Sequence, residues 1–116
     1  MNTIVELTEA DFDRVIAGTP LPAVVDFYAP WCGPCKMLAP LLTALAEHFA
    51  GRIQFFKVNV DAAPDVADRF EVRGVPMLAF FVNGEVRDLL IGFPAPPVLA
   101  AKLHALIEAK PTEARS

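Results

Sequence analysis

The sequence contains two cysteines, and they lie three positions apart in the stretch Trp31-Cys32-Gly33-Pro34-Cys35. Two thiols at this spacing can form a structural disulfide, contribute ligands to a metal site, or exchange disulfide bonds with another molecule. Each of these uses makes a different demand on the residues around the pair, so the surrounding sequence can distinguish between them.

A structural disulfide is the first alternative. Such a bond stabilises a protein mainly by closing a loop of the unfolded chain, and longer loops give more stabilisation. A bond between Cys32 and Cys35 would close a very short loop. The pair is therefore poorly suited to a purely structural role.

A metal site is the second alternative. Cys32, Cys35 and His48 match the spacing of the first three ligands of a zinc finger. A fourth ligand would be expected at 52–54, which holds Arg, Ile and Gln, and His104 is far away in the last predicted helix. We expect no metal site within one chain and both histidines on helix surfaces. A metal shared by two chains through the cysteines is a weaker alternative.

Disulfide exchange is the third alternative, and the flanking sequence favours it. The apolar segment 23–29 predicts a strand covered on both faces, and a helical pattern follows the cysteines. Cys32 would lie at the helix N-terminus, where free N–H groups and the helix dipole favour the thiolate and lower the thiol pKa. Cys35 follows almost one turn later, so its sulfur can reach Cys32. Gly33 allows close approach of a partner, and Pro34 favours helical backbone.

The composition restricts the class of protein. The chain has 116 residues, a net charge of −4 and 54% hydrophobic residues, so it can form one well-packed core. It has no basic cluster, no apolar run long enough to span a membrane, and no basic residue before Arg14. We expect a single domain over 1–116, with a frayed tail at about 111–116, in the cytoplasm and without nucleic-acid or membrane binding.

The order of predicted elements is β-α-β-α-β-α-β-β-α, which indicates an α/β fold. It predicts a single mixed sheet of about five strands flanked by about four helices. Thr8 and Asp11 resemble a capping box at the start of the first helix, and Asn83-Gly84 predicts a tight hairpin turn. The predicted strands are 3–7, 23–29, 52–60, 77–82 and 85–92. The predicted helices follow Asp11, Cys32, Ala63 and Pro97. We expect Pro40 to kink the second helix and Pro111 to end the last one.

Four segments carry a resemblance to a known family. VVDFYAPWCGPCKMLAP (24–40), FFKVNVDAAPDVADRFEVRGVPM (55–77), FFVNGEV (80–86) and IGF (91–93) resemble the thioredoxins, in particular the bacterial type with a WCGPC active site. The similarity covers nearly all of the chain. It implies the thioredoxin fold and the activity of a general protein disulfide reductase.

The resemblance also implies roles for the two cysteines and for partners. Cys32 would be the exposed nucleophile that attacks a client disulfide, and Cys35 the buried resolving thiol. The Cys32–Cys35 disulfide would be the redox centre, with no bound cofactor. Thioredoxin reductase, a flavoprotein, would reduce it again with NADPH. Client proteins that contain disulfides are the other expected partners, and we expect the protein to be a monomer.

Asp26 and Lys57 interrupt apolar predicted strands. A buried carboxylate is costly, so burial would raise the pKa of Asp26 and allow it to exchange a proton with Cys35. From the residues alone, an Asp26 paired with a lysine or facing out at a strand edge is an equal alternative, and Lys57 is better explained as a surface lysine. The resemblance implies that Asp26 transfers the proton and that Lys57 lies near it and tunes it.

The resemblance further implies an apolar docking surface beside the cysteines. From sequence alone Val75-Pro76 would be a trans bond, whereas the family has a cis proline here that leaves the Val75 backbone free to pair with a client. Trp31 could instead belong to the core. The implied surface consists of Trp31, Gly33, Pro34, Val75, Pro76, Gly92 and Phe93.

Three departures from the family pattern do not touch the chemistry: Tyr28 where a second tryptophan is frequent, Met77 where threonine is common, and Phe93-Pro94 where small residues are usual. Met77 and Phe93 border the implied docking surface, so they bear on partner choice. Two other functions remain as alternatives. The chain could be a disulfide oxidase or isomerase, which a redox potential would distinguish. It could also be a non-catalytic subunit that uses its apolar face to bind a larger enzyme.

Overall fold

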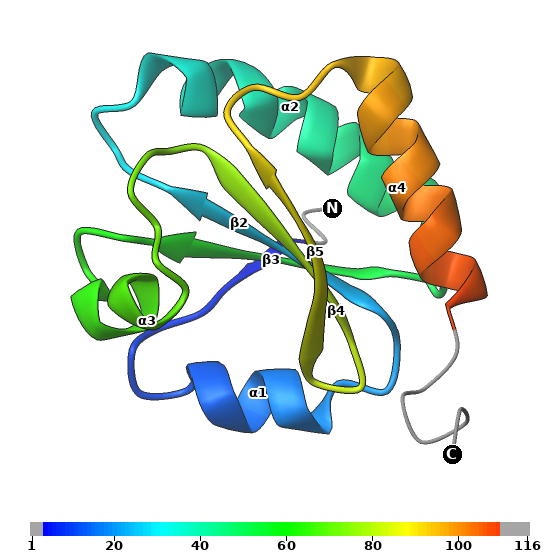
Figure 1. The fold of residues 1–116 in the computed structure, drawn as a ribbon, viewed down its shortest axis with the longest axis horizontal. Coiled ribbons are helices and arrows are strands. Elements are labelled where there is room, and N and C mark those ends of the chain that lie inside the picture. The colour runs from blue at the N-terminus through cyan, green and yellow to red at the C-terminus, as the bar shows by residue number, and fades with distance from the viewer. Residues whose placement is uncertain (1–3, 110–116) are drawn as a thin grey trace.

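The computed structural model describes residues 4–109. It has five strands and four helices in the predicted order, and it has the architecture of the thioredoxin fold (Figure 1). The strands are β1 (Ile4–Glu6), β2 (Ala23–Tyr28), β3 (Gln54–Asn59), β4 (Met77–Val82) and β5 (Glu85–Ile91). The helices are α1 (Phe12–Gly18), α2 (Gly33–His48), α3 (Pro64–Arg69) and α4 (Pro96–Glu108).

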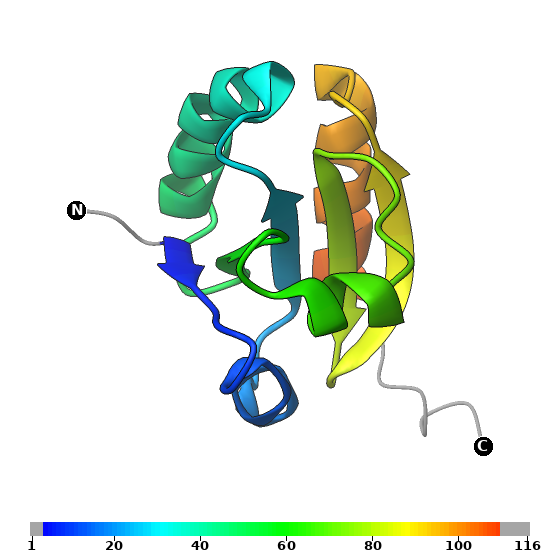
Figure 2. The ribbon, with the colours of Figure 1, turned by 90° about the vertical axis from the view of Figure 1, so that its left-hand side faces the viewer.

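The five strands form one mixed sheet in the order β1-β3-β2-β4-β5 (Figure 2). β1 and β2 both run parallel to β3, whereas β4 runs antiparallel to β2 and to β5. The parallel pairs follow from the helical crossovers between these strands, and the β4–β5 pair from the two-residue turn at Asn83-Gly84. Both turn residues have positive φ, 53° and 79°, as a hairpin turn of this type requires.

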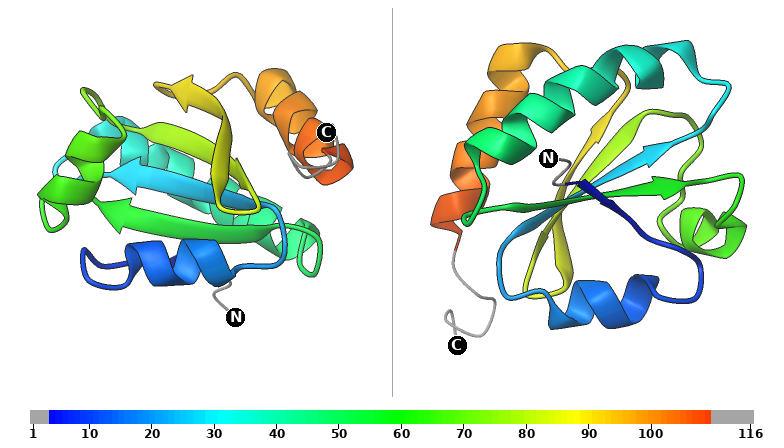
Figure 3. Two further views of the ribbon diagram at one scale, coloured as in Figure 1. Left: turned by 60° about the horizontal axis from the view of Figure 1, so that its bottom comes forward. Right: turned by 180° about the vertical axis from the view of Figure 1, so that it is seen from behind.

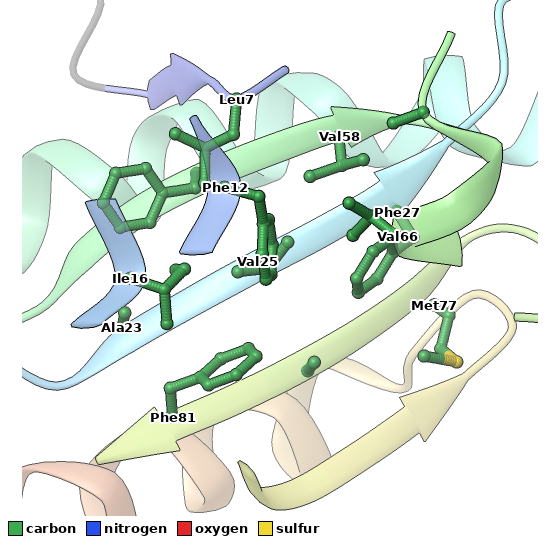
Figure 4. Packing of buried hydrophobic residues seen from close by; sticks show 13 residues of the cluster. Leu7, Phe12, Ile16, Ala23, Val25, Phe27, Val58, Val66, Met77 and Phe81 are labelled. Atoms are coloured by element: carbon green, nitrogen blue, oxygen red, sulfur yellow. The ribbon is translucent and has the colours of Figure 1, made fainter. Parts of the chain in front are cut away.

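Alternate residues of each central strand face opposite sides of the sheet, and each side has its own helices. α1 and α3 cover one side with a core that includes Phe12, Phe27 and Phe81 (Figure 4). α2 and α4 cover the other side with a core that includes Leu38 and Leu103. The left panel of Figure 3 shows the sheet between α1 and α2. Burial on both sides explains why β2 and β4 read as nearly continuous apolar runs.

Local signals in the sequence are confirmed where the structure describes them. The Thr8 amide donates to Asp11 Oδ1 at 2.7 Å, and the Asp11 amide donates to Thr8 Oγ1 at 3.3 Å, which is a reciprocal capping box. Pro64 is the first residue of α3. Pro40 lies inside α2; the kink remains a prediction. Pro111 and the predicted frayed tail lie outside the described residues.

The topology brings three distant segments to one edge of the sheet, the edge formed by the C-terminal ends of β2 and β5 and the N-terminal end of β4. β2 ends at this edge, and α2 begins just beyond it. Because β4 is antiparallel to β2, β4 starts at the same edge, and β5 returns to it (Figure 1). The residues after β2, before β4 and after β5 are therefore neighbours in space. Within residues 4–109, no helix has the length and apolar character needed to cross a membrane.

Candidate active site

Cys32 and Cys35 are joined by a disulfide bond at the start of α2. Cys32 is the N-cap residue of the helix, and its Sγ accepts a hydrogen bond from the Cys35 amide at 3.1 Å. Pro34 lies in the first turn, where a missing N–H costs nothing. When the disulfide is reduced, the same amide and the helix dipole would stabilise a thiolate on Cys32.

The expectation of an exposed Cys32 is wrong for the disulfide form. Cys32 is only 3% exposed, and Cys35 is as well buried. The two cysteines form a small buried cluster with Ala29, and the partly buried Val60 and Val75 pack against this cluster. Cys32 is covered because the loop before β4 lies directly against the start of α2, where the Val75 carbonyl contacts Cys32 Sγ.

The Val75–Pro76 peptide bond is cis, as the resemblance implied and unlike the trans bond expected from statistics. The Val75 carbonyl oxygen lies 3.6 Å from Cys32 Sγ. A disulfide sulfur carries no proton, so this is a packing contact in the present state. Pro76 itself is buried rather than part of the docking surface: it directly precedes β4, and its carbonyl accepts a hydrogen bond from the Gly92 amide at 2.8 Å.

Asp26 is the buried carboxyl of the site. It is 7% exposed, and its Oδ1 has no hydrogen-bond partner among the described residues. Burial raises the pKa of Asp26 from 3.8 to about 7, against a smaller lowering by the positive charge of Lys57. Lys57 is the register partner of Asp26 on β3, so the two side chains share one face of the sheet. The surface-lysine interpretation of Lys57 is therefore incomplete.

A cavity of about 200 Å³ connects Asp26 with the redox pair. Its lining includes Asp26, Cys35, Lys57 and Tyr28. A space of this size can hold water beside the charged groups in its lining, and water can carry protons between groups that do not touch. The cavity thus places the titratable carboxyl, the second cysteine and the lysine around one shared space.

The predicted docking surface is largely exposed. Trp31 is 70% exposed, which rules out the core interpretation, and Gly33, Pro34 and Phe93 are exposed beside it. Val75 and Gly92 are partly exposed. With the exception of Pro76, the residues predicted for this surface lie at the same edge of the sheet and are accessible.

Sequence reasoning missed three residues near the redox pair. Ile91, the last residue of β5, is 74% exposed, and Met37 on the first turns of α2 is similarly exposed. Asp61 accepts a hydrogen bond from the Trp31 indole N–H at 3.0 Å. The sequence could have indicated Asp61, because it follows β3 closely and the parallel strands β2 and β3 end at the same edge of the sheet. Ile91 carried no signal, because only the sheet order shows that β5 is an edge strand.

The two histidines lie on helix surfaces, as predicted. Both are exposed and pack edge-on against the same ring, Phe49, with centroid separations of 4.8 Å for His48 and 5.8 Å for His104. Phe49 follows the C-terminal end of α2, at the opposite end of the helix from the cysteines. Neither histidine is positioned to join Cys32 and Cys35 in a metal site.

These features define a class of protein: an α/β domain with a two-cysteine redox centre at a helix N-terminus, bordered by a cis proline and an apolar surface. The thioredoxin family model matches residues 3–105. The chain belongs to the thioredoxin family, whose members are thiol–disulfide oxidoreductases.

The chain is similar to thioredoxins from bacteria and from chloroplasts. It is 41% identical to a thioredoxin of Haemophilus influenzae over 79% of this chain and 86% of the relative. It is 37% identical to thioredoxin 1 of a Nostoc strain over the same shares. It is also 37% identical to a chloroplast thioredoxin M-type of Pisum sativum over 92% of this chain. The chain spans 62% of the pea protein's length and 54% of a second chloroplast relative, thioredoxin M2 of Arabidopsis thaliana.

Proposed function

We propose that this protein is a general protein disulfide reductase. The observation that carries the proposal is the Cys32–Cys35 disulfide at the N-cap of α2, next to an exposed apolar surface and a buried carboxyl. A redox pair in such a position can be attacked and re-formed by thiol–disulfide exchange. The exposed apolar residues beside it suit extended, partly unfolded segments of protein clients.

The first step is attack by the reduced form on a client. The Cys32 thiolate attacks one sulfur of the client disulfide, a Cys32–client S–S bond forms, and the client's own S–S bond breaks. The second client sulfur leaves as a thiolate. The Cys35 amide at 3.1 Å from Cys32 Sγ supports this role, because it stabilises the thiolate before attack.

The second step releases the client. The Cys35 thiolate attacks Cys32 Sγ, the Cys32–Cys35 bond forms, and the mixed disulfide breaks to give a second client thiolate. The client gains two electrons and this protein loses two. Asp26 accepts the Cys35 proton, directly or through water in the shared cavity. Its pKa of about 7 suits a group that must both take and release a proton near neutral pH.

The return to the dithiol requires an external reductant. We propose a flavin-containing thioredoxin reductase that uses NADPH, acting in a reducing compartment such as the cytoplasm. Proteins with accessible disulfides would be the clients. An extended client segment would lie along the Val75 backbone, with Trp31 and Phe93 beside it.

The proposal is tested by insulin reduction. Adding the protein to insulin and dithiothreitol, or to insulin with NADPH and a bacterial thioredoxin reductase, should accelerate precipitation of the insulin B chain. The double variant Cys32→Ser/Cys35→Ser is the control and should give no acceleration. No acceleration by the intact protein, with both thiols titratable after reduction, would refute the proposal.

A redox potential separates the reductase from the oxidase or isomerase. We expect equilibration with glutathione buffers to place the Cys32–Cys35 couple near the thioredoxin value of about −270 mV. A value above about −200 mV would instead identify an oxidant.

Ile91 provides a test of the docking surface. Ile91→Glu should lower kcat/KM for insulin by about tenfold, because an apolar contact worth on the order of 1.5 kcal/mol is replaced by a charge. Reduction of a small disulfide such as 5,5′-dithiobis(2-nitrobenzoic acid) should change little. The matched control is Val86→Glu, an exposed apolar residue on the same edge strand beside the hairpin turn. Equal losses in the two variants would remove Ile91 from the docking surface.

A further inference from the structure

A row of charged residues crosses the sheet beside the redox pair. Glu6 on β1 and Asp26 on β2 are both register partners of Lys57, which lies on the strand between them. Side chains that are partners in register project from the same face of a sheet. Lys57 therefore lies between two carboxyl groups, one exposed and one buried.

Tyr28 joins the two ends of this row. It lies two residues after Asp26 on β2, so it faces the same side, and it lines the cavity that contains Asp26 and Cys35. Its hydroxyl donates to Glu6 Oε2 at 2.7 Å. The Lys57 Nζ lies 5.8 Å from the centroid of the Tyr28 ring, within cation–π range.

Asp26 does not receive a hydrogen bond from Lys57 at its Oδ1, which has no partner among the described residues. The side of the cavity facing α2 contributes Cys35 and Lys36, and the neighbouring residue on β4 is the apolar Leu78. Lys57 is the cation that lowers the pKa of Asp26, so the distance between its ammonium and the carboxyl affects how readily Asp26 is ionised.

We propose that Glu6 is a positioning residue for Asp26: its carboxylate holds the Lys57 ammonium on the β1 side of the row, away from the Asp26 carboxyl. The inference rests on the proposed function, in which Asp26 exchanges a proton with Cys35. A lysine paired closely with Asp26 would keep it ionised and make it a weaker base. Holding the lysine aside leaves Asp26 able to take the proton and to return it.

Only one of two single variants should lower the pKa of Asp26, and the second, at the hydroxyl that donates to Glu6, is its comparison. Glu6→Gln removes the carboxylate that attracts Lys57, so the ammonium moves toward Asp26, and the pKa of Asp26 should fall by roughly half a unit. Tyr28→Phe removes the neutral donor of Glu6 and leaves its charge free to attract Lys57, so the pKa of Asp26 should stay the same or rise. A merely structural role, in which either change lets in water, would lower the pKa of Asp26 in both variants.

The measurement is an NMR titration of the Asp26 carboxyl carbon in the reduced protein, with the signal assigned by Asp26→Asn. Glu47→Gln is the matched control, because it removes the same charge from α2 about 18 Å along the helix from Cys35. In a Lys57→Met background, Glu6→Gln should have little effect if it acts through the lysine. A Glu6→Gln shift that is absent, upward, or undiminished without Lys57 would overturn the inference.

The titration reports the position of the lysine without any turnover, so its outcome does not depend on whether the protein reduces disulfides. The proposed function is tested separately, by whether the pH dependence of single-turnover insulin reduction shifts in the same direction as the pKa of Asp26. A pKa that moves as expected with an unmoved pH profile would support the positioning role of Glu6 and refute proton transfer by Asp26.

Discussion

Cys35→Ser should accumulate covalent complexes between this protein and its clients. The variant keeps the Cys32 thiolate, so attack on a client disulfide still forms the mixed disulfide. It lacks the sulfur that breaks this bond. Neighbouring groups in good geometry act at effective molarities of about 10⁵ M or more, which millimolar dithiothreitol cannot match. Insulin turnover should therefore fall by more than about a hundredfold, and non-reducing gels should show complexes that disappear on reduction.

Cys32→Ser is the matched control, since it removes the other sulfur with the same substitution. It should show neither turnover nor complexes, because Cys35 lies within the helix and lacks the N-cap position that favours a thiolate on Cys32. Complexes through Cys35 in this variant would reverse the two roles. The Cys35→Ser variant also offers a way to capture clients from cell extract, where mass spectrometry identifies the proteins that bind through Cys32.

Asp26→Asn should raise the free energy of unfolding of the oxidised protein, and by more at pH 8 than at pH 5. The pKa of Asp26 is about 7 in the folded protein, compared with its ordinary value of 3.8. The folded state therefore binds the proton more tightly than the unfolded chain. The stability this provides is complete below pH 3.8 and is lost as the pH rises through 7.

The expected size follows from the pH interval. Well below pH 7 the wild type loses about 1.4 kcal/mol per pH unit, and at pH 7 about half of that, so the loss from pH 5 to pH 8 is on the order of 2.5 kcal/mol, whereas asparagine has no proton to lose. Guanidinium unfolding at pH 5 and pH 8 measures the difference. Asp68→Asn on the exposed face of α3 is the control and should have the same effect at both values. An Asp26→Asn effect that does not depend on pH would mean that Asp26 is ionised throughout.

The sequence by itself determined the elements and the redox centre. Periodicity, the capping box at Thr8 and the Asn83-Gly84 turn are local signals, and the structure contains each of them. The position of Cys32 at the start of α2 is also local, because a strand, a five-residue motif and a helix are consecutive in the chain. The similarity to thioredoxins then indicated Asp26, Lys57 and the cis bond before Pro76, which composition and spacing could not.

Only the tertiary structure decided which residues surround the cysteines. The burial of Cys32 depends on how the loop before β4 lies against the start of α2, and the exposure of Ile91 depends on the place of β5 at the edge of the sheet. Glu6, Tyr28 and Lys57 are far apart in the sequence and meet because β1, β3 and β2 lie side by side in a fixed register. Local patterns determine elements because they depend on neighbours in the chain. The protonation and access of the site depend on contacts that exist only after the sheet has formed.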